Sequence, residues 1–145
     1  LEEMEPEQRE EVSELLEFEE NTAAGRMTTE YMSIDGKSTV HDAIEMLRRF
    51  EGGIESVSTI FLIEPDEKLV GAVPLSKIVL ASHDTPLVQL AVEPLISTHA
   101  GADEKEVAEK FDKYNLLTLP VVDETGKLTG VITADDVISL LRSKL

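Results

Sequence analysis

One segment of this chain occurs twice, and this repeat limits the possible folds more than any other feature. Residues 60–73 return 59 positions later as residues 119–132, without a gap. Both copies read as an apolar strand, a polar turn and a second apolar strand. Upstream the match continues at a spacing of 64, which indicates an insertion in the first copy near residues 51–55. A period this long exceeds that of solenoid repeats, so we expect two copies of one small unit that must pack together to bury their apolar faces.

Each copy predicts the order strand, helix, strand, strand, helix. The first copy predicts a strand over 31–34, a helix capped by Ser38 or Thr39, hairpin strands over 59–64 and 69–73, and a helix over 75–81. The second copy predicts a strand over 95–98, a helix from Asp103 to Tyr114, a hairpin over 119–132 and a helix over 134–142. Because a lone hairpin is unstable, we expect an α+β fold of two pseudo-symmetric β-α-β-β-α repeats packed together.

The N-terminal segment differs from the repeats. Residues 1–20 hold ten glutamates and one arginine, and Pro6 to Phe18 predicts a short acidic helix with a narrow apolar stripe. We expect this helix to end a larger helical domain and residues 21–29 to form a polar linker into the first repeat. The predicted domains are residues 1–24 for the helix and linker, 25–87 for the first repeat and 88–145 for the second.

Charge and composition exclude several classes of function. The net charge of -17 would repel the phosphate backbone, so nucleic acid is not an expected partner, whereas cations are the natural counterpart of such a surface. The sequence has no cysteine, and therefore neither disulfides nor thiolate metal sites. It has no Gly-x-Ser-x-Gly, His-Glu-x-x-His or glycine-rich phosphate loop, and its three histidines show no close ligand spacing. Enzymatic activity is the least supported class.

The residues around the second hairpin identify a family resemblance. The order of elements, with Leu119–Asp123 before the turn and Gly130–Val137 after it, resembles the cystathionine-β-synthase (CBS) domain, which occurs in tandem pairs. Residues 21–31 and 114–123 are similar to stretches of MgtE-type magnesium transporters. This resemblance implies a homodimeric regulatory module on the cytoplasmic side of the cell membrane, attached to the transmembrane domain of the same full-length chain. In that family, bound magnesium holds acidic surfaces together and favours the closed pore.

Thr133 and Asp136 are the clearest candidate ligand-binding residues. In CBS domains that bind adenine nucleotides, a Ser or Thr and an Asp three residues later hold the ribose hydroxyls, and the resemblance implies that role here. The alternative is that Thr133 only caps a helix whose first turn carries the acid. The equivalent positions in the first repeat are Pro74 and Lys77, which offer no acceptor to a ribose hydroxyl. The family's known ATP site resembles that first-repeat position, so its ATP binding does not carry over directly.

The candidate magnesium ligands are Asp136, Asp135 and Asp112. The family's metal-sensing acids in the second repeat correspond here to Asn115, Asp136 and Ser139, of which only Asp136 is acidic. Asp135 and Asp112 could substitute, because magnesium takes oxygen ligands and keeps several waters. The alternative for each is a solvated surface acid. The leading hypothesis is thus a Mg²⁺-sensing module that gates transport through compaction of a dimer. The alternatives are an adenine-nucleotide sensor without a metal role, or a plain dimerisation module.

Overall fold

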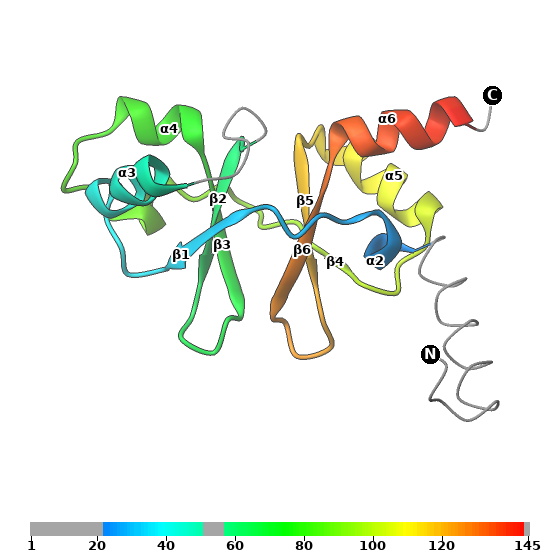
Figure 1. The fold of residues 1–145 in the computed structure, drawn as a ribbon, viewed down its shortest axis with the longest axis horizontal. Helices are drawn as coiled ribbons and strands as arrows, with labels where there is room; N and C mark the ends of the chain where they lie inside the picture. Colours follow the sequence, from blue (N-terminus) through cyan, green and yellow to red (C-terminus); the bar gives the residue numbers. More distant parts are fainter. Residues whose placement is uncertain (1–21, 51–56, 144–145) are drawn as a thin grey trace.

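The computed structural model describes residues 22–50 and 57–143, and both repeats have the predicted order of elements (Figure 1). The first repeat contains β1 (Met32–Asp35), α3 (Val40–Arg49), β2 (Thr59–Ile63), β3 (Leu69–Pro74) and α4 (Leu75–Leu80). The second contains β4 (Thr98–His99), α5 (Glu104–Tyr114), β5 (Thr118–Val122), β6 (Leu128–Thr133) and α6 (Ala134–Ser143). The predicted α+β fold of two β-α-β-β-α repeats is confirmed. The expected acidic helix at residues 6–18 and the insertion at 51–55 lie outside the described residues.

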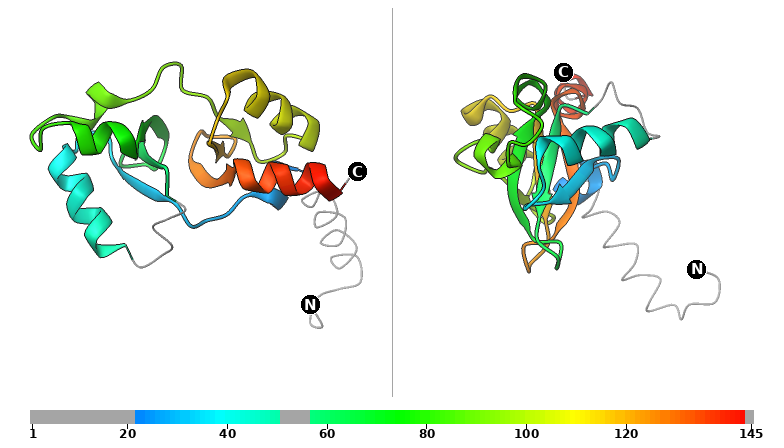
Figure 2. Two further views of the ribbon diagram at one scale, coloured as in Figure 1. Left: turned by 90° about the horizontal axis from the view of Figure 1, so that it is seen from above. Right: turned by 90° about the vertical axis from the view of Figure 1, so that its left-hand side faces the viewer.

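Each repeat forms its own three-stranded sheet with the same topology. The first strand pairs in parallel with the second, and the second pairs antiparallel with the third, in both β1-β2-β3 and β4-β5-β6. Ile60 lies opposite Val73 in the first hairpin, and Leu119 lies opposite Ile132 in the second, which preserves the 59-residue spacing. Figure 2 shows the two sheets between helices that lie at opposite ends of the molecule. The sequence repeat is therefore a structural repeat.

The apolar side chains form one core in each repeat and a third cluster between the repeats. Ile60, Leu62 and Val73 are among the residues that fill the first core, and Leu119, Val121 and Ile132 fill the second. The third cluster joins the two sheets and consists of the buried residues Phe61, Ala72, Leu128 and Val131. Burial of apolar surface between the sheets supplies the stabilisation that neither repeat achieves alone. The expected packing of the two repeats into one body is confirmed.

The predicted helix starts are present with their capping hydrogen bonds. The Asp42 amide donates to the Thr39 hydroxyl at 3.4 Å, and the Thr39 amide donates to the Asp42 carboxylate at 2.9 Å. This reciprocal pair satisfies two free amides of the first turn of α3. The hydrogen bond from the Thr39 backbone holds the pKa of the Asp42 carboxyl below its usual value. At α5, the Asp103 carboxylate accepts from the Glu106 amide at 2.8 Å.

The predicted linker is wrong for the stretch from Thr22 to Thr28, which is packed against the second repeat. It contains a short helix, α2 (Ala23–Arg26), whose first residue is fully buried in the second core. Thr28 exchanges two backbone hydrogen bonds with Val131 of β6, at 2.8 and 2.9 Å. Figure 1 shows the segment crossing from α2 at the second repeat to β1 in the first. Small residues such as Ala23 suggested a linker, but here their size permits close packing.

Two further elements differ from the predictions. The first strand of the second repeat was expected over 95–98 but covers only Thr98–His99, because Leu95 and Ile96 line a cavity between the repeats. A 3₁₀ helix, η2 (Leu87–Leu90), was not predicted and buries Leu87 completely in the first core. Both differences fall in the connection between the repeats. Its local sequence does not show which of its residues pack against the first core or the cavity.

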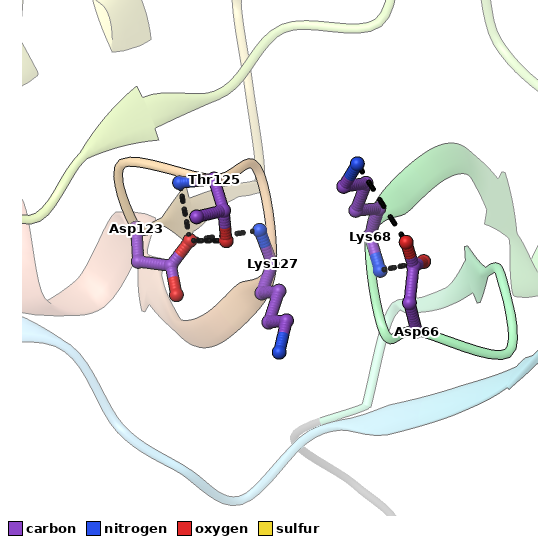
Figure 3. A network of polar contacts seen from close by, with 5 residues as sticks. All are labelled: Asp66, Lys68, Asp123, Thr125 and Lys127. Carbon is purple, nitrogen blue, oxygen red and sulfur yellow. Dashed lines mark hydrogen bonds and ion pairs between the residues drawn. The ribbon is translucent and has the colours of Figure 1, made fainter.

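The two hairpin turns contact each other through the backbone. The Leu69 amide donates to the Gly126 carbonyl at 3.0 Å, and the Leu128 amide donates to the Glu67 carbonyl at 3.1 Å. Figure 3 shows the neighbouring side chains: Asp123 Oδ1 accepts from the amide and hydroxyl of Thr125 and from the Lys127 amide, at 2.7 to 3.0 Å. These bonds, first that from the Thr125 hydroxyl, lower the pKa of the Asp123 carboxyl. The tips thus fix the position of one repeat against the other.

Candidate functional site

A cavity of about 200 Å³, here called the polar cleft, lies where the two repeats meet. Its walls come from the segment before β1, from β2 and the residues before it, and from β5, β6 and α6. The polar side chains that line it are Thr28, Glu30, Tyr31, Ser58, Thr59, Thr118, Thr133 and Asp136. The cleft therefore combines hydroxyl groups, carboxylates and an aromatic ring within one cavity.

Thr133 and Asp136, the two predicted ligand-binding residues, both line the polar cleft. They also form the cap of α6: the Thr133 hydroxyl donates to Asp136 Oδ2 at 2.9 Å, and the Asp136 amide donates to the Thr133 hydroxyl at 3.3 Å. The helix-cap interpretation and a position facing the cleft are thus both present. Asp136 Oδ1 has no hydrogen-bond partner among the residues that the structure describes. That oxygen remains an acceptor for a ligand hydroxyl.

A second cavity of about 220 Å³, here called the apolar cleft, lies at the pseudo-symmetric position. The sequence spacings of 64 and 59 relate its lining residues to those of the polar cleft. At these positions the polar residues Thr28, Glu30, Tyr31 and Ser58 become Val92, Pro94, Leu95 and Leu117. Pro74 and Lys77, the equivalents of Thr133 and Asp136, are not among its lining residues. The two clefts share a position in the fold but differ in chemistry.

Thr59, Phe61 and Thr118 line both clefts and form the wall between them. The Thr118 hydroxyl donates to the Thr59 hydroxyl at 3.4 Å, and these two residues are equivalent in the repeat. The Tyr31 ring meets the Phe61 ring edge to face, with centroids 6.2 Å apart. Our sequence reasoning missed these residues, although the spacing of 59 that relates the two threonines could have identified them.

The polar cleft is acidic. Its ionisable lining residues are Glu30, Asp136 and Tyr31, and the lining contains neither lysine nor arginine. Among the described residues, neither carboxylate forms an ion pair. Burial, and secondarily the charge of Glu67, raises the pKa of the Tyr31 hydroxyl, which stays neutral and donates to the Leu128 carbonyl at 3.4 Å. The cleft thus presents negative charge and neutral hydroxyl groups to a ligand.

The three candidate magnesium ligands occupy exposed positions on two helices. Asp112 lies on α5, and Asp135 and Asp136 lie in the first turn of α6. Within residues 22–50 and 57–143, no three histidine, aspartate or glutamate side chains lie close enough together to hold a metal ion. Asp112 is therefore not brought into one site with the other two in a single chain. The magnesium site stays a prediction.

No helix in the described part of the chain is both long and apolar enough to cross a bilayer.

Comparison with known proteins places both repeats in one family. The CBS domain model matches residues 23–84 and 88–143. The magnesium transporter MgtE from Enterococcus faecalis is 33% identical over 90% of this chain. The magnesium transporter MgtE from Thermus thermophilus is 31% identical over 97% of it. The chain spans 29% and 31% of the length of these relatives.

Two solved structures support the same relationship. The soluble part of a magnesium transporter superposes with a TM-score of 0.82 at 31% identity, over 97% of this chain and 55% of that one. The cytosolic domain of the Mg²⁺ channel MgtE in complex with ATP gives a TM-score of 0.81 at 32% identity, over 94% and 55% of the two chains. With two matched repeats in one folded body, this chain belongs to the CBS domain family as a tandem CBS pair, homologous to the cytosolic domain of MgtE magnesium transporters.

Proposed function

We propose that this chain is the cytosolic regulatory CBS pair of a magnesium transporter, and that it responds to divalent cations rather than catalysing a reaction. The observation that carries the proposal is the identity of 31% to 33% with magnesium transporters over at least 90% of the chain. The net charge of -17 supports it, because such a surface attracts cations. In this proposal the chain is attached to a transmembrane domain at the cytoplasmic face of the cell membrane.

The proposed mechanism is electrostatic. At low Mg²⁺, carboxylates on the two chains of a homodimer repel each other, and bound cations remove that repulsion and favour a compact state. A complete shift between two states requires about 5 kcal/mol of differential binding. More than one weakly bound ion is therefore needed. Asp135 and Asp136 on α6 and Asp112 on α5 are the proposed ligands, with the remaining coordination from water or the partner chain.

Small-angle scattering with increasing Mg²⁺, at ionic strength held constant with NaCl, tests this mechanism. We expect the radius of gyration of the dimer to fall with Mg²⁺ and to respond less in a D112N/D135N/D136N variant. A variant with three exposed acids outside the proposed site neutralised, E106Q/E109Q/E124Q, controls for the loss of charge. An unchanged radius of gyration at saturating Mg²⁺, or equal responses of the two triple variants, contradicts the proposal.

The second candidate function is adenine-nucleotide sensing in the polar cleft. The observation that favours it is that Thr133 and Asp136 line this cavity, with Asp136 Oδ1 available to accept from a ribose hydroxyl. A relative of known structure binds ATP, which adds support for a nucleotide in a CBS pair of this type. Calorimetry of the 145-residue chain with adenosine, AMP and ATP tests it. We expect Asp136→Ala to remove the heat of binding, and equal heats in the variant and the wild type contradict it.

A further inference from the structure

The side chains of the polar cleft match the base and the sugar of a nucleotide but not its phosphate. Tyr31 offers aromatic surface to a base, supported edge to face by the buried Phe61 ring, and base stacking on an aromatic side chain contributes about 1–3 kcal/mol. Asp136 Oδ1 and the Thr59 and Thr118 hydroxyls offer hydrogen bonds to a sugar. The lining holds nothing of positive charge that would bind a phosphate. This argument builds on the second candidate function proposed above.

The charge of the cleft acts against phosphate. Glu30 and Asp136 carry negative charge into the lining, and neither forms an ion pair with any described residue. A phosphate monoester adds about -1.5 to -2 at neutral pH. Sites that bind phosphates usually supply arginine, lysine or a helix N-terminus with free amides. Here two first-turn amides of α6 already have partners: the Asp136 amide donates to the Thr133 hydroxyl, and the Ala134 amide donates to the Leu117 carbonyl.

The apolar cleft does not duplicate the site, because its lining lacks both carboxylates and most of the hydroxyl groups of the polar cleft.

From the lining and its charge together, we propose that the polar cleft selects an uncharged nucleoside over its phosphates and that Glu30 is a residue determining this selectivity. Glu30 comes from the segment that crosses from α2 to β1, so the same segment that joins the repeats also sets the charge of the site. Its equivalent in the apolar cleft is Pro94.

Isothermal titration calorimetry with adenosine, AMP and ATP, all with EDTA present, tests the proposal. Binding to the polar cleft is defined as the heat that Asp136→Asn removes, with a thermal melt to show that this variant is folded. We expect adenosine to bind at least about fivefold more tightly than AMP, and ATP more weakly still. Glu30→Gln should strengthen AMP binding about threefold or more relative to adenosine binding. Glu109→Gln removes a charge on α5 outside the cleft and should change neither.

The outcomes separate this inference from the function on which it rests. Tighter binding of AMP or ATP than of adenosine in the Asp136-dependent heat overturns the selectivity and leaves nucleotide sensing intact. An equal response of the two glutamate variants overturns the role of Glu30. If none of the three ligands gives Asp136-dependent heat, nucleotide sensing itself fails, and the selectivity fails with it.

Discussion

Replacing Gly130 by alanine should destabilise the protein by more than the roughly 1 kcal/mol that a typical point substitution costs. A Cβ at Gly130 would lie 2.6 Å from Met27 Sδ, 2.9 Å from Met27 Cγ and 3.0 Å from the Thr28 carbonyl oxygen. The methionine can rotate away, but the Thr28 backbone is held by its two hydrogen bonds to Val131. Overpacking costs about 1–3 kcal/mol, and two weakened hydrogen bonds cost about 0.5–1.5 kcal/mol each. Because the two hydrogen bonds are weakened rather than lost, we expect a total loss of about 2–4 kcal/mol.

Urea denaturation followed by circular dichroism measures this change. For a domain of this size, the expected loss corresponds to a fall in melting temperature of roughly 5–15 °C. Gly101→Ala is the matched control, because a Cβ there has no neighbour within 4 Å and we expect a change within about 0.5 kcal/mol.

A second variant separates the two contacts at Gly130. Met27→Ala in the Gly130→Ala background should recover about 1 kcal/mol, since it removes the side-chain clash but leaves the backbone contact. If Gly130→Ala is as stable as Gly101→Ala, the close approach of the crossing segment to β6 is incorrect, and so is the packing argument built on it.

Further predictions concern single positions. Gly126→Ala should cost about 1–2 kcal/mol of stability, because Gly126 has a φ of 90°. Glu67 occupies the equivalent turn position with a φ of 72°, so Glu67→Gly should stabilise the protein by about 0.5–1 kcal/mol. Urea denaturation of both variants tests whether the two changes in stability have opposite signs. Thr98→Val should stabilise by about 1 kcal/mol, since the buried Thr98 hydroxyl has no hydrogen-bond partner among the described residues; an unchanged or lower melting temperature contradicts this. The lowered pKa of Asp123 gives a contribution to stability that is present above the usual value of 3.8 and disappears as the pH falls through the folded-state pKa. The melting temperature of Asp123→Asn should therefore fall less than that of the wild type as the pH is lowered through this acidic range. If the two proteins lose the same melting temperature over this range, Asp123 does not make the proposed contribution to stability.

The repeat allowed most of the fold to be predicted, because the pattern of each helix and strand could be checked in two copies. The hairpins and the caps at Thr39 and Asp103 depend on residues close in sequence, and all are present. The docking of Ala23 depends on contacts with residues about eighty positions away. Nothing in the local pattern could distinguish that segment from a linker.

The candidate site was predicted only in part, for the same physical reason. Thr133 and Asp136 were identified from the family resemblance, whose Thr and Asp three residues later share one turn of the chain. Glu30 and Tyr31 reach the same cavity from the other repeat, and a sequence does not show which segments meet across an interface. Asp112 was grouped with Asp135 by charge alone, and no metal cluster joins them within the described residues.

The segment from Thr22 to Thr28 precedes the first repeat in sequence but packs against the second repeat. Residues 1–21 precede Thr22, which bridges to Asp103 at the start of α5, and Arg26 pairs with Glu104 at 3.0 Å. A force applied upstream of Thr22 would therefore reach the second half first, and only then the first half. The C-terminal half expressed alone would have a cavity in place of Ala23 and would lose the Thr28 hydrogen bonds to Val131, so we expect it to be less stable than the same half in the intact chain.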